Sequence, residues 1–425
     1  MEQNFKIGVI GLGYVGFPLA CLFAKKYQVI GYDINDKRIK EINAGIDSTN
    51  EVSPQALENA LANGMRCTSL LDDLKVCNVY IIAIPTPVDD FYNPELLPLK
   101  KASTSVGKVL KKGDYVIYES TVYPGVTEEV CAPILEEVSG LKLNNDFFLG
   151  YSPERINPGD RVHTVENIPK ITSGSTPEAA DVIDRLYNSV LLKGTHRAPN
   201  IKVAEAAKIL ENTQRDVNIA FMNEIAVVFN ALGIDTTDVL EAAGTKWNFL
   251  KFTPGLVGGH CISVDPYYLI QRATMRGVVP RIMIEARRLN NTMGNYIAER
   301  VVRCMNLHNI SALNAKVLLL GFTFKENCPD IRNTKVVDVY NSLKSYTSDI
   351  RIFDPWVNKD TAMHEYGMEV STDERDLERG QYDAVIYCVK HDCFDSIEME
   401  TLCKENGVFY DVKGCLSKKM VTERL

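Results

Sequence analysis

The residue with the clearest chemical potential in this 425-residue chain is Cys261, which closes the glycine-rich turn Gly258-Gly259-His260-Cys261. Glycines let a backbone approach a substrate closely and present N–H groups to a developing oxyanion. The pair Asp265-Pro266 follows and predicts a helix start, with Asp265 as the cap and proline at the first position. A thiol near a helix N-terminus is expected to be acidified and nucleophilic. Burial as a small hydrophobic side chain is the alternative.

A second candidate site is the loop Gly11-Leu12-Gly13-Tyr14-Val15-Gly16, which follows an apolar segment and opens an apolar helix. Gly11 is expected to permit the tight turn, Gly13 to admit a pyrophosphate, and Gly16 to allow close helix–strand packing. Asp33 ends the next strand, where a carboxylate can bind ribose hydroxyls. Because it would repel a 2′-phosphate, NAD is favoured over NADP as the cofactor. A glycine-rich turn without a ligand is the alternative.

Polar residues elsewhere could complete such a site. Lys208 and Asn212 are four residues apart, so they share a helix face. The lysine is either partly desolvated, with a tuned pKa, or extends to solvent. Ser120 and Thr121 could hold water or a ribose, or only cap a helix. Glu154 is either a general base or a surface carboxylate.

Four more residues allow a chemical and a structural interpretation. His260 is a general base or a turn residue, and Asp265 is an acid/base or a helix cap. Lys325 and Arg332 could clamp a diphosphate or sugar hydroxyls, or be solvated surface charges. A dinucleotide loop and a reactive thiol in one chain together suggest an oxidation through a covalent sulfur adduct, which can carry an alcohol past the aldehyde to the acid.

The elements that must position these residues form an α/β pattern. Continuous apolar runs predict buried parallel strands in both the first and the last part of the chain. They lie at 6–10, 28–32, 78–84, 114–118, 147–150, 316–320, 349–353, 382–388 and 408–411. Helical spacing predicts a helix at 17–24, a long helix at 201–232 ended by Gly233, and a helical stretch between 282 and 307.

These elements predict two Rossmann-like, doubly wound domains joined by a central α-helical region. We expect a dinucleotide-binding domain at 1–199, a helical dimerisation and catalytic domain at 200–310, and a smaller α/β domain at 311–425. The strand-end loops of the two sheets are expected to form one cleft.

Composition narrows the class of protein. The formal net charge of −8 argues against general nucleic-acid binding. The start of the chain has no secretory signal, and no apolar run approaches the roughly 18 residues that span a bilayer. The 11 cysteines lack disulfide or metal-ligand spacing, so we expect reduced thiols in a cytoplasm and no metal.

Taken together, the motifs resemble the UDP-glucose/GDP-mannose dehydrogenase family over essentially the whole chain. The ordered motifs that carry the resemblance are GLGYVGFPLA at Gly11, PTP at Pro85, ESTVYPG at Glu119, SPER at Ser152, AAKILEN at Ala206, GGHC at Gly258 and GFTFKENCPDIR at Gly321. The family implies a homodimeric, cytoplasmic, NAD-dependent four-electron oxidation of a nucleotide sugar at C6.

The resemblance assigns a role to each matching position. Cys261 resembles the nucleophile, Lys208 and Asn212 the oxyanion-stabilising pair, and Asp265 a helper in proton transfer. Thr121 and Glu154 resemble the residues that hold and activate the hydrolytic water. The implied NAD contacts are Gly11, Gly13, Tyr14, Val15, Gly16, Asp33, Arg38, Pro85, Thr86, Ser120, Thr121 and Lys325. The implied substrate contacts are Glu154, Arg155, Lys208, Asn212, Asn248, Phe249, Leu250, Lys251, Gly258, His260, Phe324, Lys325 and Arg332.

The substrate expected from the resemblance is a UDP-N-acetylhexosamine, either UDP-GlcNAc or UDP-GalNAc. GGHC and its surroundings resemble the members that act on these sugars, and the uronate product would feed capsule or O-antigen synthesis in a bacterium. UDP-glucose and UDP-N-acetylmannosamine are alternative substrates. A two-electron β-hydroxyacid dehydrogenase is a competing enzyme class, since it also places a lysine and an asparagine four apart, but it needs neither Cys261 nor a second α/β domain. A non-catalytic nucleotide-binding regulator is the remaining alternative.

Overall fold

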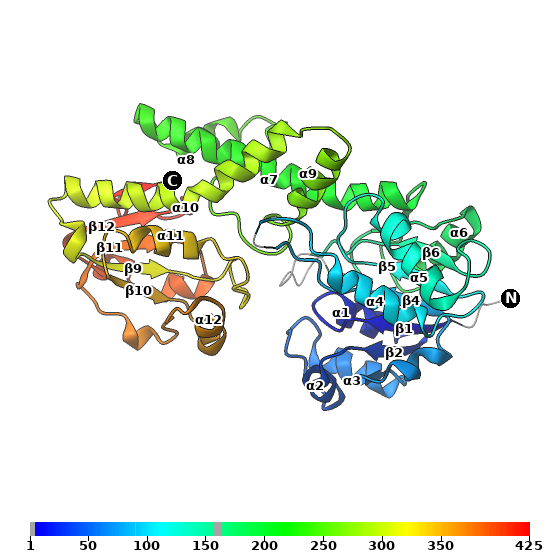
Figure 1. Ribbon diagram of the computed structural model, residues 1–425. Helices are drawn as coiled ribbons and strands as arrows, with labels where there is room; N and C mark the ends of the chain where they lie inside the picture. The colour runs from blue at the N-terminus through cyan, green and yellow to red at the C-terminus, as the bar shows by residue number, and fades with distance from the viewer. Residues whose placement is uncertain (1–4, 90, 157–163) are drawn as a thin grey trace. The chain divides into compact units, whose positions relative to one another are not determined.

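A computed structural model describes residues 5–89, 91–156 and 164–425 (Figure 1). The chain divides into two compact units. The first unit extends to Glu211 and also contains Tyr267–Val278, and the second comprises Asn212–Pro266 and Val279–Leu425.

The first unit is built on a six-stranded parallel sheet in the order β3-β2-β1-β4-β5-β6. Its strands are β1 (Lys6–Ile10), β2 (Gln28–Tyr32), β3 (Arg66–Thr68), β4 (Val79–Ile82), β5 (Tyr115–Tyr118) and β6 (Phe148–Tyr151). This is the strand order of dinucleotide-binding sheets, in which ligands bind beyond the carboxyl ends of the strands near the reversal between β1 and β4.

Helices and a small second sheet complete the first unit. The helices are α1 (Gly16–Phe23), α2 (Asp36–Asn43), α3 (Pro54–Ala62), α4 (Leu97–Gly107), α5 (Ala132–Ser139) and α6 (Pro177–Asn188). The short strands β7 (Lys170–Thr172) and β8 (Thr195–Arg197) pair in parallel. Val9 and Ile81 of the large sheet pack with Phe17 of α1 and Leu186 of α6 in one buried core.

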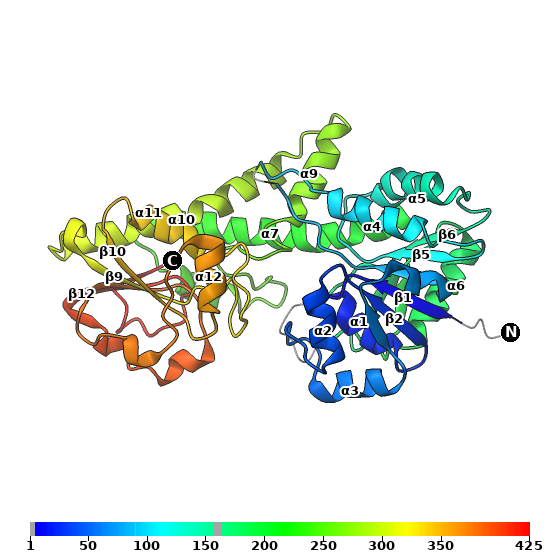
Figure 2. The same cartoon turned by 60° about the horizontal axis from the view of Figure 1, so that its bottom comes forward.

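The second unit contains a five-stranded parallel sheet in the order β10-β9-β11-β12-β13. Its strands are β9 (Lys316–Leu320), β10 (Asp349–Phe353), β11 (Tyr382–Tyr387), β12 (Cys403–Asp411) and β13 (Glu423–Arg424), and its helices are α8 (Thr236–Ala243), α10 (Arg281–Leu307), α11 (Val336–Leu343) and α12 (Lys359–Tyr366). Counted within the unit, the order is 2-1-3-4-5, the other common doubly wound arrangement. Figure 2 shows α10 and α11 side by side along this sheet.

Alternation along β9 explains why this sheet is covered on both faces. Val317 and Leu319 belong to the core formed with α10 and α11, whereas Leu318 and Leu320 belong to a separate core that includes Phe394. Successive side chains of a strand point to opposite faces. The continuous apolar run therefore fills two cores, as in a doubly wound sheet.

Two helices contribute residues to both units. The 32-residue helix α7 (Ile201–Leu232) passes from the first unit into the second, and α9 (Asp265–Met275) begins in the second unit and continues in the first. Gly233 ends α7 in the left-handed region, at φ 70°. Its missing side chain makes that conformation accessible.

The predicted fold class is confirmed, and β1, β2, β9, β10 and α7 have the predicted bounds. Predicted bounds elsewhere need correction: β4 is shorter, β6 is shifted by one residue, and β12 begins earlier, at Cys403. Helix α9 includes Asp265 as its first residue, where the sequence predicted a cap. The division at 199 and 310 stays a proposal. Within the described residues, no helix is both long enough and apolar enough to cross a membrane.

Candidate active site

Of the three glycines in the loop after β1, only Gly13 has open space beside it. Gly11 adopts φ 92°, and a Cβ there would lie 2.6 Å from the Ala83 carbonyl oxygen. A Cβ on Gly16 would lie 1.9 Å from the Gly11 oxygen, whereas one on Gly13 would meet nothing within 4 Å. The turn and the packing thus require Gly11 and Gly16, while Gly13 faces open space. An open backbone at the start of α1 fits a pyrophosphate.

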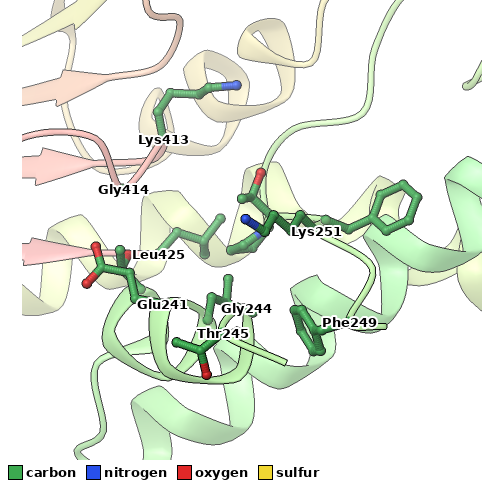
Figure 3. A pocket seen from close by; sticks show the side chains of 13 residues that line it. Glu241, Gly244, Thr245, Phe249, Lys251, Lys413, Gly414 and Leu425 are labelled. Carbon is green, nitrogen blue, oxygen red and sulfur yellow. The ribbon is translucent and has the colours of Figure 1, made fainter. Parts of the chain in front are cut away.

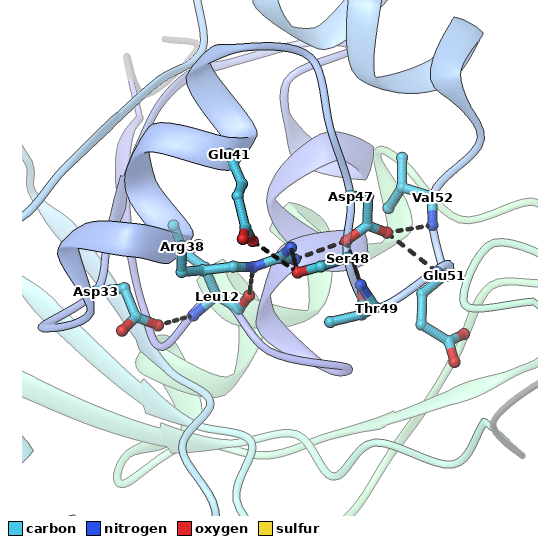
Figure 4. A network of polar contacts seen from close by, with 9 residues as sticks. All are labelled: Leu12, Asp33, Arg38, Glu41, Asp47, Ser48, Thr49, Glu51 and Val52. Atoms are coloured by element: carbon cyan, nitrogen blue, oxygen red, sulfur yellow. Dashed lines mark hydrogen bonds and ion pairs between the residues drawn. The ribbon is translucent and has the colours of Figure 1, made fainter. Parts of the chain in front are cut away.

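Asp33 and Arg38 brace this loop (Figure 4). Asp33 Oδ2 accepts the Leu12 N–H at 2.8 Å. Arg38 is buried, and it donates Nε to the Leu12 oxygen at 2.9 Å, Nη1 to Ser48 and Nη2 to Asp47 at 2.7 Å. Burial opposes ionisation of Asp47, but hydrogen bonds from residues that include Arg38 outweigh it and lower the pKa of Asp47. Arg38 therefore acts here as a support, and its predicted NAD contact stays a prediction.

The motifs that begin at Pro85 and Glu119 meet at the carboxyl edge of the sheet. Ser120 Oγ donates to the Ile84 oxygen at 2.7 Å and accepts the Ile84 N–H at 3.0 Å. Thr86 Oγ1 donates to the Thr121 oxygen at 2.7 Å. These bonds join the ends of β4 and β5, next to the reversal in strand order where a dinucleotide is expected.

Glu154 follows β6 and is buried at 6% exposure, so the interpretation as a surface carboxylate was wrong. Its Oε1 accepts the N–H groups of Arg155 and Ile156 at 2.6 and 2.8 Å. The Arg155 side chain pairs with Glu211 of α7 at 2.7 Å. A buried, anchored carboxylate at a strand end is suited to act as a general base.

Lys208 is also buried, at 7% exposure, which excludes a lysine that extends to solvent. The same helix carries Glu205, which holds a neighbouring turn in place. Nothing in the sequence around Glu205 predicted this contact. Glu205 accepts the N–H groups of Gly125 and Thr127 at 2.5 and 3.0 Å. Burial raises the pKa of Glu205 to about 7, against the lowering effect of these bonds. It ties α7 to the turn that follows Thr121.

In the second unit, the glycines before Cys261 allow close packing. A Cβ on Gly258 would lie 2.6 Å from the Asn333 oxygen, and one on Gly259, which has φ 83°, would lie 2.8 Å from the Phe324 ring. The Cys261 oxygen accepts the Asp265 N–H at 2.8 Å, which places the thiol residue in the turn that leads into α9. The cysteine is partly exposed.

Four residues that the sequence singled out one by one are brought together in pairs in this unit. Asn212 Nδ2 donates to Asp265 Oδ2 at 2.5 Å, and Asp265 is 2% exposed. Asp330 accepts from Arg332 Nη2 at 2.6 Å and lies 3.3 Å from His260 Nε2. Burial works against ionisation of Asp330, but His260 and Arg332 together hold its pKa well below the usual range. His260 and Arg332 are thus joined through a carboxylate that the sequence did not single out.

A cavity of about 470 Å³ in the second unit includes two predicted substrate residues, Phe249 and Lys251 (Figure 3). Gly244 and Thr245 at the end of α8 lie on one side of it. Lys413, which follows β12, lines this cavity and also a smaller one beside Gly258 and Phe324. Sequence reasoning missed Lys413 because a single lysine after a strand is indistinguishable from surface charge.

A buried polar network supports the loop that carries Cys261. The Asn223 amide accepts the Gly255 N–H at 2.8 Å and donates to the Gly255 oxygen at 3.1 Å. It also bonds Asn290 at 2.8 Å, and Asn290 bonds the Asp216 carboxylate at 2.7 Å. Arg287 pairs with the same carboxylate at 2.5 Å. Helices α7 and α10 therefore fix the beginning of this loop through fully buried side chains.

The strand order of the first sheet and the open backbone at Gly13 are the features of a dinucleotide-dependent enzyme. Three models of one family match the chain: its NAD binding domain at 5–191, its central domain at 202–292 and its UDP binding domain at 318–418. The chain belongs to the UDP-glucose/GDP-mannose dehydrogenase family, as the sequence motifs implied, and is an NAD-dependent dehydrogenase of nucleotide sugars.

Relatives cover the whole chain. It is 54% identical to the UDP-N-acetyl-D-glucosamine 6-dehydrogenase of Pseudomonas aeruginosa over 100% of both chains, and 50% identical to that of Salmonella typhi over 100% of this chain and 99% of the relative. Among solved structures, UDP-D-ManNAc dehydrogenase from Pyrococcus horikoshii matches with a TM-score of 0.89 and 31% identity, over 99% of this chain and 98% of that one.

Proposed function

We propose that this protein oxidises C6 of UDP-N-acetylglucosamine to the uronic acid through a covalent adduct on Cys261. The high identity to two enzymes named for this substrate, over full length, supports the sugar. The cavity lined by Phe249 and Lys251 supports a ligand site in the second unit. A role for the uronate in capsule or O-antigen synthesis follows from the same proposal.

The proposed chemistry assigns one task to each group. The glycine loop at Gly11, Gly13 and Gly16 would hold NAD, which would supply the hydride acceptor for oxidation at C6 of the sugar. The Cys261 thiolate adds to the resulting aldehyde, and the charge that develops on oxygen is stabilised by Lys208 and Asn212. Asp265, which accepts from Asn212, holds that amide and helps move the proton. Loss of a second hydride from C6, for which a second NAD at the same loop would be the acceptor, leaves a thioester on Cys261. A water held by Thr121 and activated by Glu154 hydrolyses that thioester.

The NADH yield tests this proposal directly. With limiting UDP-N-acetylglucosamine, we expect two NADH for each sugar and a uronate product, measured by absorbance and mass spectrometry. UDP-N-acetylgalactosamine, UDP-N-acetylmannosamine and UDP-glucose serve as parallel substrates. One NADH per sugar would remove the thiol step, and two from UDP-N-acetylmannosamine alone would favour the second candidate substrate, which the P. horikoshii structure supports.

We further propose a homodimer, with a stripe along α7 as the interface. Its exposed apolar side chains are Val203, Leu210, Phe221, Val228 and Leu232. The spacings of seven, eleven, seven and four residues keep them on one face of a 3.6-residue helix. An apolar stripe on such a long helix favours a second copy of the same surface.

Phe221→Glu should therefore convert the dimer to a monomer, because a charge would be buried at the centre of the stripe. Light scattering after size-exclusion chromatography measures the mass. Leu313→Glu is the matched control, since Leu313 is also exposed but lies outside α7. A Phe221→Glu protein with an unchanged dimeric mass would exclude this stripe as the dimer interface.

We also propose that the enzyme works in the cytoplasm, where thiols such as Cys261 stay reduced.

A further inference from the structure

Glu154 forms an ion pair with a buried lysine. Lys170, the first residue of β7, is 1% exposed. Its Nζ donates to Glu119 Oε2 at 2.6 Å, to the Pro153 oxygen at 2.9 Å and to Glu154 Oε2 at 3.3 Å. An ammonium group has three N–H donors, so these three acceptors engage all of them. The Lys170 ammonium group is therefore shielded from solvent and bridges the two carboxylates.

The lysine also limits what Glu154 can still accept. Its Oε1 takes the backbone N–H groups of Arg155 and Ile156, and its Oε2 takes Lys170. An ionised carboxylate offers about four acceptor positions. Among the described residues, three donors reach Glu154, which leaves about one position, on Oε2. A carboxylate that three donors fix in place can present its remaining lone pair to a water molecule in one orientation.

Glu119 is the other partner of the lysine. It is 2% exposed, and its Oε1 accepts from the Tyr187 hydroxyl at 2.5 Å. Burial raises the pKa of Glu119 to about 7, against the lowering effect of Lys170. Lys170 itself has a raised pKa, because the two carboxylates outweigh its burial. Glu119 and Glu154 thus share one lysine, whose ammonium group stays cationic.

We propose that Lys170 and Glu119 are positioning residues that set the orientation and the charge of Glu154 during hydrolysis of the thioester. This inference rests on the proposed function. In that step the water oxygen bonds to the thioester carbon, the C–S bond breaks, and its electron pair returns to Cys261 as a thiolate. The water proton passes to Glu154, which must be anionic to accept it. Among the residues that the structure describes, the charged groups next to this cluster are Arg155, whose N–H bonds to Glu154, and its partner Glu211.

Opposite charge changes should move the pH profile in opposite directions. Where Glu119 is ionised, Glu119→Gln removes a negative charge that opposes ionisation of Glu154, so the acid limb of kcat should shift to lower pH. Lys170→Gln removes the positive charge and leaves two buried carboxylates, so the limb should shift to higher pH. A neighbouring charge at this distance moves such a limb by about one pH unit or more. The measurement is kcat for acid formation between pH 5.5 and about 9.5.

Glu205→Gln is the matched control for burial. Glu205 is a fully buried carboxyl whose pKa is also raised to about 7, but its bonds go to Gly125 and Thr127. This variant should leave the limb in place, whatever it does to the rate. Lys170→Arg keeps the charge and should restore the wild-type limb. If Lys170→Gln does not fold, the comparison of Glu119→Gln with Glu205→Gln still decides the sign.

Glu154→Gln separates this inference from the proposed function. Accumulation of a thioester on Cys261 in this variant, seen by intact-protein mass, would support the assigned role of Glu154. If Glu119→Gln and Lys170→Gln then leave the acid limb unmoved, or move it in the same direction, only the positioning role of Lys170 and Glu119 is overturned. If Glu154→Gln hydrolyses the thioester at the wild-type rate, the assigned role of Glu154 fails, and the positioning role fails with it.

Discussion

Cys261→Ser should form no more than one NADH per sugar and should lose acid formation by roughly 10³-fold or more, the scale expected when a covalent nucleophile is removed. A serine hydroxyl ionises far less readily than a thiol, so it is a much weaker nucleophile near neutral pH. The turn itself should survive, because Gly258 and Gly259 carry its tight packing against Asn333 and Phe324. Product mass and NADH yield in single-turnover reactions measure the outcome.

Cys393→Ser is the control for this experiment, because Cys393 is an exposed thiol elsewhere in the second unit. It should keep the wild-type yield. Full acid formation by Cys261→Ser would contradict the covalent route and leave oxidation of a free aldehyde hydrate as the alternative.

Lys208→Met should slow thioester formation by about 10²- to 10³-fold, the cost typical of losing one oxyanion-stabilising donor. The side chain is nearly the same length and apolar, and Lys208 is buried, so the packing of α7 should change little. The effect should appear in kcat more than in sugar affinity, since the oxyanion exists only after the thiol adds. Rapid-mixing measurement of the second NADH separates this step from the first.

Lys202→Met is the matched control, because Lys202 lies on the same helix but is exposed and pairs with Glu129 at 3.1 Å. It should behave as wild type. If Lys208→Met weakens sugar binding and leaves both oxidation steps unchanged, Lys208 is a binding residue and not an oxyanion donor.

Local patterns predicted the elements that are defined by short stretches of sequence. The strands β1, β2 and β9 are mainly apolar runs, and β10 has apolar residues at Ile350, Ile352 and Phe353. Helix α7 combines helical spacing with a final glycine. The bounds of these elements therefore followed from the sequence. The strands β7, β8 and β13 have two or three residues each, which is too short for any periodicity. Their position is fixed by tertiary pairing.

The same distinction between local and tertiary features separates the site residues that were predicted from those that were not. The glycine loop and the turn before Cys261 were predictable because each is one contiguous motif with a steric reason for its glycines. The buried partners were not. Lys170 lies 51 residues from Glu119, and Glu205 lies 80 residues from Gly125, so only the strand order and the path of α7 bring these groups together.

The bracing of the glycine loop has a consequence for protein engineering. A change of coenzyme preference towards NADP usually replaces the acidic residue after the second strand and recruits an arginine for the extra phosphate. Here Asp33 also accepts the Leu12 N–H, and Arg38 is already held by Leu12, Ser48 and Asp47. A redesign would therefore have to supply a new cation and a new acceptor at once, which makes this scaffold a poor starting point for a single-site coenzyme switch.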